Sequence, residues 1–259
     1  MNIIDKLQGA KHKIIKRLSC LSEGVYYVSP GELGEPQLKK SDIHKFPRDP
    51  VYLREKIHTL SDLILYVRAA NFKARKGDIR IHEGPIIWHH NRTGPETICL
   101  NTGNCGGVSS MLNYILKGKY DEVGFMALTD HQGGHVFNYI LHQNHYYFID
   151  LLNYLYGSQS IDHRATMIYQ ADTLQHYADF YRDNAEWVIL LFVAYQADHV
   201  LPIGRHPGQP LKYFPSGSQL NVLHETPQQG IIADHWLQQR RPRNLVECPL
   251  NEIMINDSR

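Results

Sequence analysis

The sequence has few cysteines, almost no net charge and no long apolar run, and each shortage excludes a class of protein. Its four cysteines include no C-x-x-C pair, so neither a zinc site nor a dithiol redox motif is expected. The formal net charge is +1, which gives no reason to expect nucleic acid as a partner. The longest apolar run, Trp187 to Tyr195, is too short to span a bilayer, so no integral membrane segment is expected.

Signatures of targeting and of cofactor binding are also missing. The apolar residues near the N-terminus are followed by polar ones, unlike the continuous apolar core of a secretory signal. There is no P-loop, no dinucleotide fingerprint and no internal repeat. The adjacent His89 and His90 would point in different directions on a strand, so we expect no metal there. These absences favour a cytoplasmic protein that uses neither a metal nor a cofactor.

What the sequence does contain is a cysteine at the predicted start of a helix. Apolar residues follow it with the spacing of one buried helical stripe, at Val108, Met111, Leu112, Ile115 and Leu116. Asn104 is a suitable N-cap, and Lys117-Gly118 is a suitable end. In the first turn, the helix dipole and the unpaired backbone N–H groups favour the thiolate form of Cys105. Cys105 is therefore a candidate nucleophile, and a buried cysteine after a glycine-rich turn is the alternative.

Two β-rich runs after this helix predict a hairpin that carries a histidine and an aspartate. The runs cover residues 136–141 and 146–151, and the polar residues 142–145 separate them. With a turn at Gln143-Asn144, Asp150 falls opposite Phe137, and His135 lies two residues along on the same face. A turn shifted by one residue keeps His135 and Asp150 on one face. The two side chains are then suited to act as base and orienting carboxylate for Cys105.

Asp130 and His131 are rival catalytic residues on the loop before this hairpin. His131 has no carboxylate at strand-pair distance behind it, whereas His135 has Asp150, so we prefer His135. The nearby histidines could also suggest a metal site. However, His142 and His145 lie at the predicted turn, far from His135, and this argues against a shared ion.

The segment from about Leu60 to Asp150 resembles the transglutaminase-like superfamily, a branch of the papain-like cysteine enzymes. The resemblance rests on the cysteine, histidine and aspartate motifs in this order: Gly103-Asn104-Cys105-Gly106, Gly134-His135-Val136-Phe137-Asn138, and Asp150. A helix over residues 61–68 also lies where the family usually has one. The chain departs from the family at Gly106, where many members have Trp or Ala, and at Phe137, where many have Trp. The resemblance implies a triad of Cys105, His135 and Asp150 and leaves the substrate class open.

The resemblance also implies an oxyanion site beside the cysteine. In such enzymes an upstream Trp or amide side chain can help the cysteine's backbone N–H group, and Trp88 and Asn101 are the candidates here. Plain packing is the alternative role for Trp88. Three further residues beside the nucleophile and the base are candidates for contact with substrate: Asn104, Gly106 and Gly134.

Composition and patterning divide the chain into three parts. Residues 1–48 are expected to form an N-terminal basic amphipathic helix, over residues 2–18, and an irregular connection. Residues 49–237 are expected to form a transglutaminase-like catalytic domain, and 238–259 a polar tail. Within the domain we expect one long helix over about 49–76, extended chain over 79–90, a strand over 121–128, a helix over 171–182, a strand over 187–193 and a loop over 202–218.

Together these features predict an α+β fold with a papain-like, transglutaminase-like core, in which the cysteine helix packs on an antiparallel sheet. The predicted function is cysteine-dependent acyl transfer through a thioester, most simply hydrolysis of a peptide or side-chain amide by a peptidase, amidase or deamidase. The expected partner is a peptide, a protein or another amide-containing substrate. Two alternatives remain: a transglutaminase or N-acyltransferase with an amine acceptor, and a transglutaminase-like domain that is a binding module without catalysis.

Overall fold

The computed structural model describes residues 20–22, 24–74, 79–129, 134–156, 168–185, 188–205 and 212–226. The predicted N-terminal helix, the whole of the predicted C-terminal tail, and the rival residues Asp130 and His131 lie outside this set. The described chain is a mixture of helices and antiparallel sheet, so the predicted α+β class is confirmed. None of the helices in these ranges is long and apolar enough to cross a membrane.

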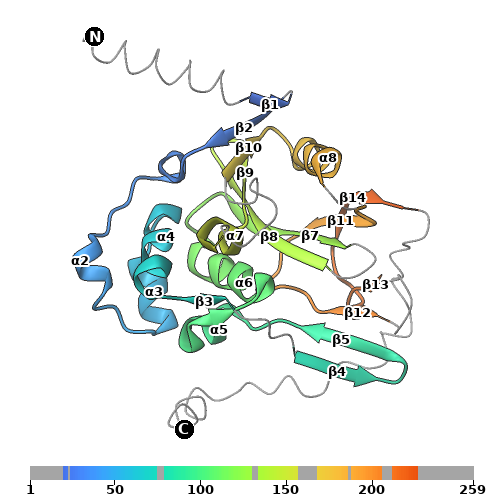
Figure 1. The fold of residues 1–259 in the computed structure, drawn as a ribbon, viewed down its shortest axis with the longest axis horizontal. Coiled ribbons are helices and arrows are strands. Elements are labelled where there is room, and N and C mark those ends of the chain that lie inside the picture. The colour runs from blue at the N-terminus through green and yellow to red at the C-terminus, as the bar shows by residue number, and fades with distance from the viewer. Residues whose placement is uncertain are drawn as a thin grey trace.

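An eight-stranded sheet runs through the centre of the molecule (Figure 1). Its strands lie in the order β1-β2-β10-β9-β8-β7-β11-β14, and every neighbouring pair is antiparallel. The strands are β1 (Cys20–Ser22), β2 (Val25–Val28), β7 (Glu122–Thr129), β8 (Gly134–His142), β9 (His145–Ile149), β10 (Ile168–Ala171), β11 (Leu191–Tyr195) and β14 (Asn221–Glu225).

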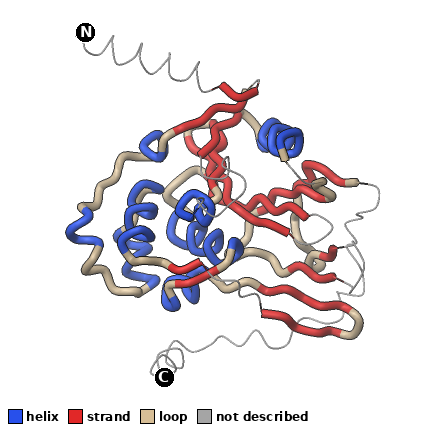
Figure 2. The backbone as a smooth tube through the Cα atoms, viewed as in Figure 1, coloured by secondary structure: helices blue, strands red, loops and turns tan. Residues whose placement is uncertain are grey.

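Helices cover both faces of this sheet, as Figure 2 shows in blue. One face packs against a helical layer whose core includes residues from α4, α6 and α7. The other face packs against α8, whose buried Tyr177 and Ala178 meet the aromatic side chains of the sheet. The helices are η1 (Pro30–Leu33, a 3-10 turn), α2 (Lys40–Ile43), α3 (Pro50–Lys56), α4 (Leu60–Ala69), α5 (Gly94–Leu100), α6 (Cys105–Leu116), α7 (Leu151–Tyr156) and α8 (Leu174–Asn184).

The helix predicted over residues 49–76 is two helices, α3 and α4, so the single long helix is wrong. The break lies where Thr59 and Asp62 form a capping box that begins α4. The carboxylate of Asp62 is fully buried and also accepts hydrogen bonds from the backbone N–H groups of Gln37 and Leu38, at 2.8 and 2.9 Å. The apolar periodicity continues across the break because both helices bury their stripes in one core.

Two smaller sheets complete the fold. The four-stranded sheet has the order β13-β12-β5-β4, and its hairpin lies where extended chain is predicted over 79–90. Its strands are β4 (Ile79–Glu83), β5 (Ile86–His90), β12 (Ile203–Arg205) and β13 (Lys212–Tyr213), and the two-stranded sheet pairs β3 (Lys73–Ala74) with β6 (Thr102–Gly103). Residues 202–218, predicted as a loop, therefore contain two strands.

Other sequence predictions are confirmed or corrected at the level of element bounds. The helix after Cys105 spans Cys105–Leu116 as predicted, and the helix over 171–182 is α8. The strand predicted over 187–193 begins only at Leu191. The stretch 22–48, predicted as irregular, contains β2, which pairs with β10 and extends the central sheet. β2 has only four residues, too few for an alternation of apolar and polar side chains to distinguish a strand from a loop.

Candidate active site

Cys105 is the first residue of α6, and three polar side chains hold this end of the helix in place. Asn104 caps it, because its side-chain Oδ1 accepts a hydrogen bond from Gly107 N at 2.9 Å. On the face toward the sheet, Ser109 donates to the carbonyl of Val136 on β8 at 3.2 Å, and Asn138 donates back to the carbonyl of Ser109 at 3.2 Å. These buried bonds fix the start of α6 against the start of β8.

The β8–β9 hairpin has the register predicted from its sequence. His142 pairs with His145, and Asn138 pairs with Ile149. The two turn residues, Gln143 and Asn144, have φ values of 51° and 62°, the left-handed pair that a two-residue type I′ turn requires. The same register carried one residue past Ile149 sets Asp150 beside His135 on one face of the hairpin.

His135 and Asp150 are in contact, and Asp150 is held from its other side. The Nε2 atom of His135 is hydrogen-bonded to Oδ2 of Asp150. Asn153 donates to the same carboxylate twice, from its backbone N at 3.1 Å and from its side-chain Nδ2 at 2.6 Å. The first of these bonds is an N-cap at the start of α7. The carboxylate is therefore fixed in direction by three donors before any substrate binds.

The thiol of Cys105 completes a line of three groups. It is hydrogen-bonded to the imidazole of His135 and to the backbone N–H of Val136. Because Nε2 of His135 faces Asp150, Nδ1 is the ring nitrogen left for the sulfur. The side chain of His135 is 23% exposed and that of Asp150 10%, and Cys105 is partly buried, so all three groups are largely shielded from solvent.

The electrostatics of this line favour a thiolate–imidazolium pair. Burial raises the pKa of the Cys105 thiol, but the hydrogen bonds from His135 and Val136 and the charge of His135 outweigh it, so the pKa falls below its ordinary value. Burial lowers the pKa of His135, but the charge and hydrogen bond of Asp150, with those of Cys105, raise it well above its ordinary value. Burial raises the pKa of Cys99, whose side chain is half-buried.

The predicted oxyanion and substrate candidates have different surroundings in the structure. Asn101 is the left-handed C-cap of α5, and its Nδ2 donates to the carbonyls of Ala70 and Asn71, which commits it to a turn. Trp88 is buried on β5 with its ring over Gly204 of β12, and its indole N–H has no hydrogen-bond partner among the described residues. Gly134 begins β8 and is exposed.

Two asparagines at the site are not among the residues predicted from the sequence. Asn153 braces Asp150, and the spacing of three residues between them is the N-cap spacing that could have revealed it. Asn91, in the link between β5 and α5, lies against Gly106 and bonds Asn104 at 2.9 Å. Asn91 and Cys105 are 14 residues apart, and only the tertiary fold brings the two segments together.

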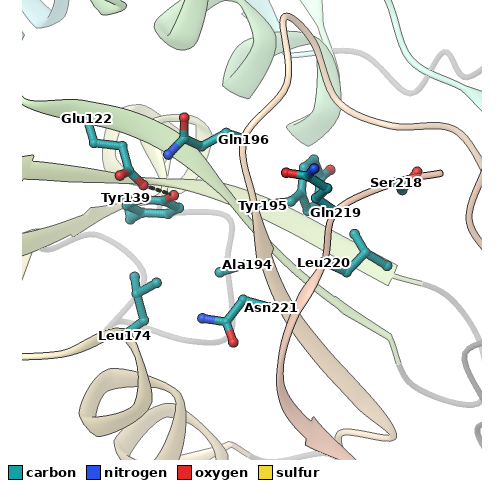
Figure 3. A pocket seen from close by; sticks show the side chains of 10 residues that line it. All are labelled: Glu122, Tyr139, Leu174, Ala194, Tyr195, Gln196, Ser218, Gln219, Leu220 and Asn221. Atoms are coloured by element: carbon teal, nitrogen blue, oxygen red, sulfur yellow. Dashed lines mark hydrogen bonds between the residues drawn. The ribbon is translucent and has the colours of Figure 1, made fainter.

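A hollow of about 740 Å³ lies away from the triad (Figure 3). Tyr139 reaches it by lying across Gly124 of the next strand and bonding the carboxylate of Glu122, where a Cβ on residue 124 would lie 2.4 Å from the ring. Tyr139 is four residues along β8 from His135, or roughly 14 Å by strand rise. The lining residues are Glu122, Tyr139, Leu174, Ala194, Tyr195, Gln196, Ser218, Gln219, Leu220 and Asn221, so no triad residue borders this hollow.

Comparison with protein-family models, with curated proteins and with solved structures gives no match for this chain. In the described ranges, no group of three or more histidine, cysteine, aspartate or glutamate side chains is arranged to hold a metal ion. The groups that define the chemistry of the site are the side chains of Cys105, His135 and Asp150. A thiol, an imidazole and a carboxylate in a hydrogen-bonded line can activate a sulfur nucleophile and transfer one proton.

Proposed function

We propose that this chain is a cysteine-dependent acyl-transfer enzyme that hydrolyses a peptide or side-chain amide. The observation that carries the proposal is the line from Cys105 through His135 to Asp150, with the sulfur at the N-terminus of α6. The α+β fold, with the cysteine helix against an antiparallel sheet, supports a papain-like core of the transglutaminase-like kind. Each of the three groups has a separate role in the chemistry below.

In the acylation step the thiolate of Cys105 attacks the carbonyl carbon of the substrate and a C–S bond forms. The carbonyl oxygen takes up the negative charge in a tetrahedral intermediate, which collapses as the C–N bond breaks. The imidazolium of His135 gives its proton to the leaving nitrogen, so a neutral amine departs and a thioester remains. Asp150 holds the ring and stabilises its charged form, as its contact with Nε2 allows.

In the deacylation step the neutral His135 takes a proton from water as the water attacks the thioester. The C–S bond breaks, a carboxylic acid is released, and the thiolate–imidazolium pair is restored. Water is the favoured acceptor because, in the described part of the chain, no second carboxylate contacts Cys105 or His135 to hold an amine. An amine acceptor would turn the same thioester into a transferase product.

Intact-mass analysis of acid-quenched reactions tests the proposal most simply. The protein is mixed with a panel of peptide, glutamine-containing and aryl ester substrates, and the mass of an acyl group on Cys105 is sought. The Cys105→Ala variant should show neither adduct nor turnover, and Cys99→Ala should show both. If no substrate gives an adduct and Cys105 is no more reactive than Cys99, the binding-module alternative is the better description.

The same experiment with an added primary amine separates hydrolase from transferase. We expect low-millimolar amine to divert little of the acyl group from water. Efficient amide formation at that concentration would make the transferase the correct name while leaving the triad in place.

A further inference from the structure

The side chain of Asn91 packs very closely against Gly106, the residue after the nucleophile. The side-chain amide of Asn91 lies so close to the Cα of Gly106 that a Cβ there would be 2.1 Å from Cγ, 2.3 Å from Oδ1 and 2.5 Å from Nδ2. No side chain larger than hydrogen fits at residue 106 while Asn91 stays in place. The glycine that distinguishes this chain from many members of the resembling family therefore makes room for an amide group beside Cys105.

The hydrogen bonds around Asn104 determine which end of the Asn91 amide is free. Gly107 N is a donor, so the atom of Asn104 that it meets must be the acceptor Oδ1. The other end of the Asn104 amide is then the donor Nδ2, and its partner on Asn91 must be the acceptor Oδ1, at 2.9 Å. By this chain of donors and acceptors, the N-cap of α6 also orients Asn91 and leaves its two Nδ2 hydrogens uncommitted.

Two backbone N–H donors lie at the start of α6, where Asn91 contacts the helix. Cys105 and Gly106 are the first two residues of α6, so their N–H groups have no partner within the helix. The cap accepts instead from Gly107 N, and the carbonyl of Asn104 accepts from Val108 N at 3.0 Å. Within the described residues no hydrogen-bond partner is found for the amides of Cys105 and Gly106 or for Nδ2 of Asn91. These unpaired donors belong to the nucleophile itself, to the residue after it and to the side chain that contacts Gly106.

We propose that Nδ2 of Asn91 is the side-chain donor of an oxyanion site, acting together with the backbone N–H of Cys105. The proposal rests on the acyl-transfer function proposed above, because an oxyanion forms only when the sulfur attacks a carbonyl. It replaces Asn101, whose amide is committed to the carbonyls of Ala70 and Asn71. Asn91 would be a catalytic residue, and Asn104 a positioning residue that acts through it.

Two reactions of the same thiol separate this role from a merely structural one. Acylation by p-nitrophenyl acetate passes through a tetrahedral oxyanion, whereas alkylation by iodoacetamide displaces iodide and forms none. Loss of one oxyanion donor typically costs about 10²–10³ in rate. We therefore expect Asn91→Ala to slow the burst of p-nitrophenolate by about 10²-fold and to leave the iodoacetamide rate within about threefold of the wild type.

Gly106→Ala provides a second variant that keeps Asn91 in the chain. Its methyl group should displace the amide and reproduce the loss of acylation, although alanine is a better helix former than glycine. In a double-mutant cycle, adding Gly106→Ala to Asn91→Ala should slow acylation little further, because the amide that the methyl group displaces is already gone. Asn101→Ala is the matched control, an upstream asparagine whose loss should affect stability and spare the ratio of the two rates.

Each outcome of these rate measurements either supports or overturns the role proposed for Asn91. Selective loss of acylation in both single variants, without additivity in the double variant, supports the assignment. Equal loss of acylation and alkylation in Asn91→Ala would reduce Asn91 to a structural support for α6, and an unchanged burst would remove it from the site. A wild-type protein that gives no burst at all would overturn the acyl-transfer function and this assignment with it.

Discussion

At the scale of single residues, the site pairs a thiol that loses its proton more readily than usual with an imidazole that holds one more firmly. The pKa of Cys105 is lowered and that of His135 is raised, and the same hydrogen bond contributes to both shifts. Asp150 makes this possible by contacting the far nitrogen of the ring. The carboxylate is itself fixed by Asn153, so the ring has one preferred tautomer and direction.

Asp150→Asn tests the carboxylate without disturbing the fold. Asn is as good an N-cap as Asp, so α7 should begin as before and the melting temperature should stay near native. An amide cannot stabilise the imidazolium, so turnover should fall by roughly 10⁴-fold. Asp198→Asn is the control, because that carboxylate is exposed and pairs with Lys117 on the surface. Near-native turnover in Asp150→Asn would remove Asp150 from the mechanism.

The pH dependence of turnover follows from the two shifted pKa values. As the pH falls through the lowered pKa of Cys105, the thiolate is protonated and attack stops. As the pH rises through the raised pKa of His135, the imidazolium loses the proton that the leaving nitrogen needs. A plot of kcat/KM over about pH 5 to 9 should therefore show an acid limb below the ordinary thiol pKa and an alkaline limb well above the ordinary imidazole pKa. An optimum whose acid limb lies at an ordinary thiol pKa would contradict the ion pair.

At the scale of elements, buried polar groups decide where helices begin and which strands they meet. Asp62 begins α4 and ties it to the segment of Gln37 and Leu38. Ser109 and Asn138 tie α6 to β8. Each of these groups sits in the core and makes hydrogen bonds to backbone groups there, so its removal would leave backbone donors or acceptors unpaired.

A pair of aspartates measures this difference between buried and exposed caps. Asp62 is fully buried and also accepts from the backbone N–H groups of His58 and Thr59, both at 3.3 Å, so Asp62→Ala should lower the free energy of unfolding by about 3 kcal/mol or more. Asp49 caps α3 on the surface with one bond to Tyr52 N at 3.0 Å, and Asp49→Ala should cost about 1 kcal/mol. Urea unfolding of both variants gives the two values. Equal costs would mean that burial of the Asp62 network adds nothing.

How far the sequence predicts this fold depends on the range of the interaction. The register of the β8–β9 hairpin and the bounds of α6 were predictable, because a two-residue turn and a helical stripe are local patterns. The break between α3 and α4 was not, because the carboxylate of Asp62 binds backbone groups more than twenty residues away. Asn91 was missed for the same reason, since its contacts with Asn104 and Gly106 join two segments that only the tertiary fold brings together.

At the scale of the whole molecule, the sheet and its two helical layers serve to bring three distant residues into one line. Cys105 comes from the helical layer, His135 from the start of β8, and Asp150 from the end of β9. The 740 Å³ hollow lies further along the same strands and does not share these residues. The central claim is therefore that the fold makes one of its cysteines an activated nucleophile.

Iodoacetamide labelling with peptide mapping, over about pH 5 to 9, tests that claim most directly. Cys99 is an internal control in the same chain, because burial raises its thiol pKa whereas His135 and Val136 lower that of Cys105. We predict that Cys105 is labelled much faster than Cys99 near neutral pH and that its rate has already reached a plateau there. Equal labelling of the two cysteines, or a Cys105 rate that rises only above about pH 8, would contradict the account.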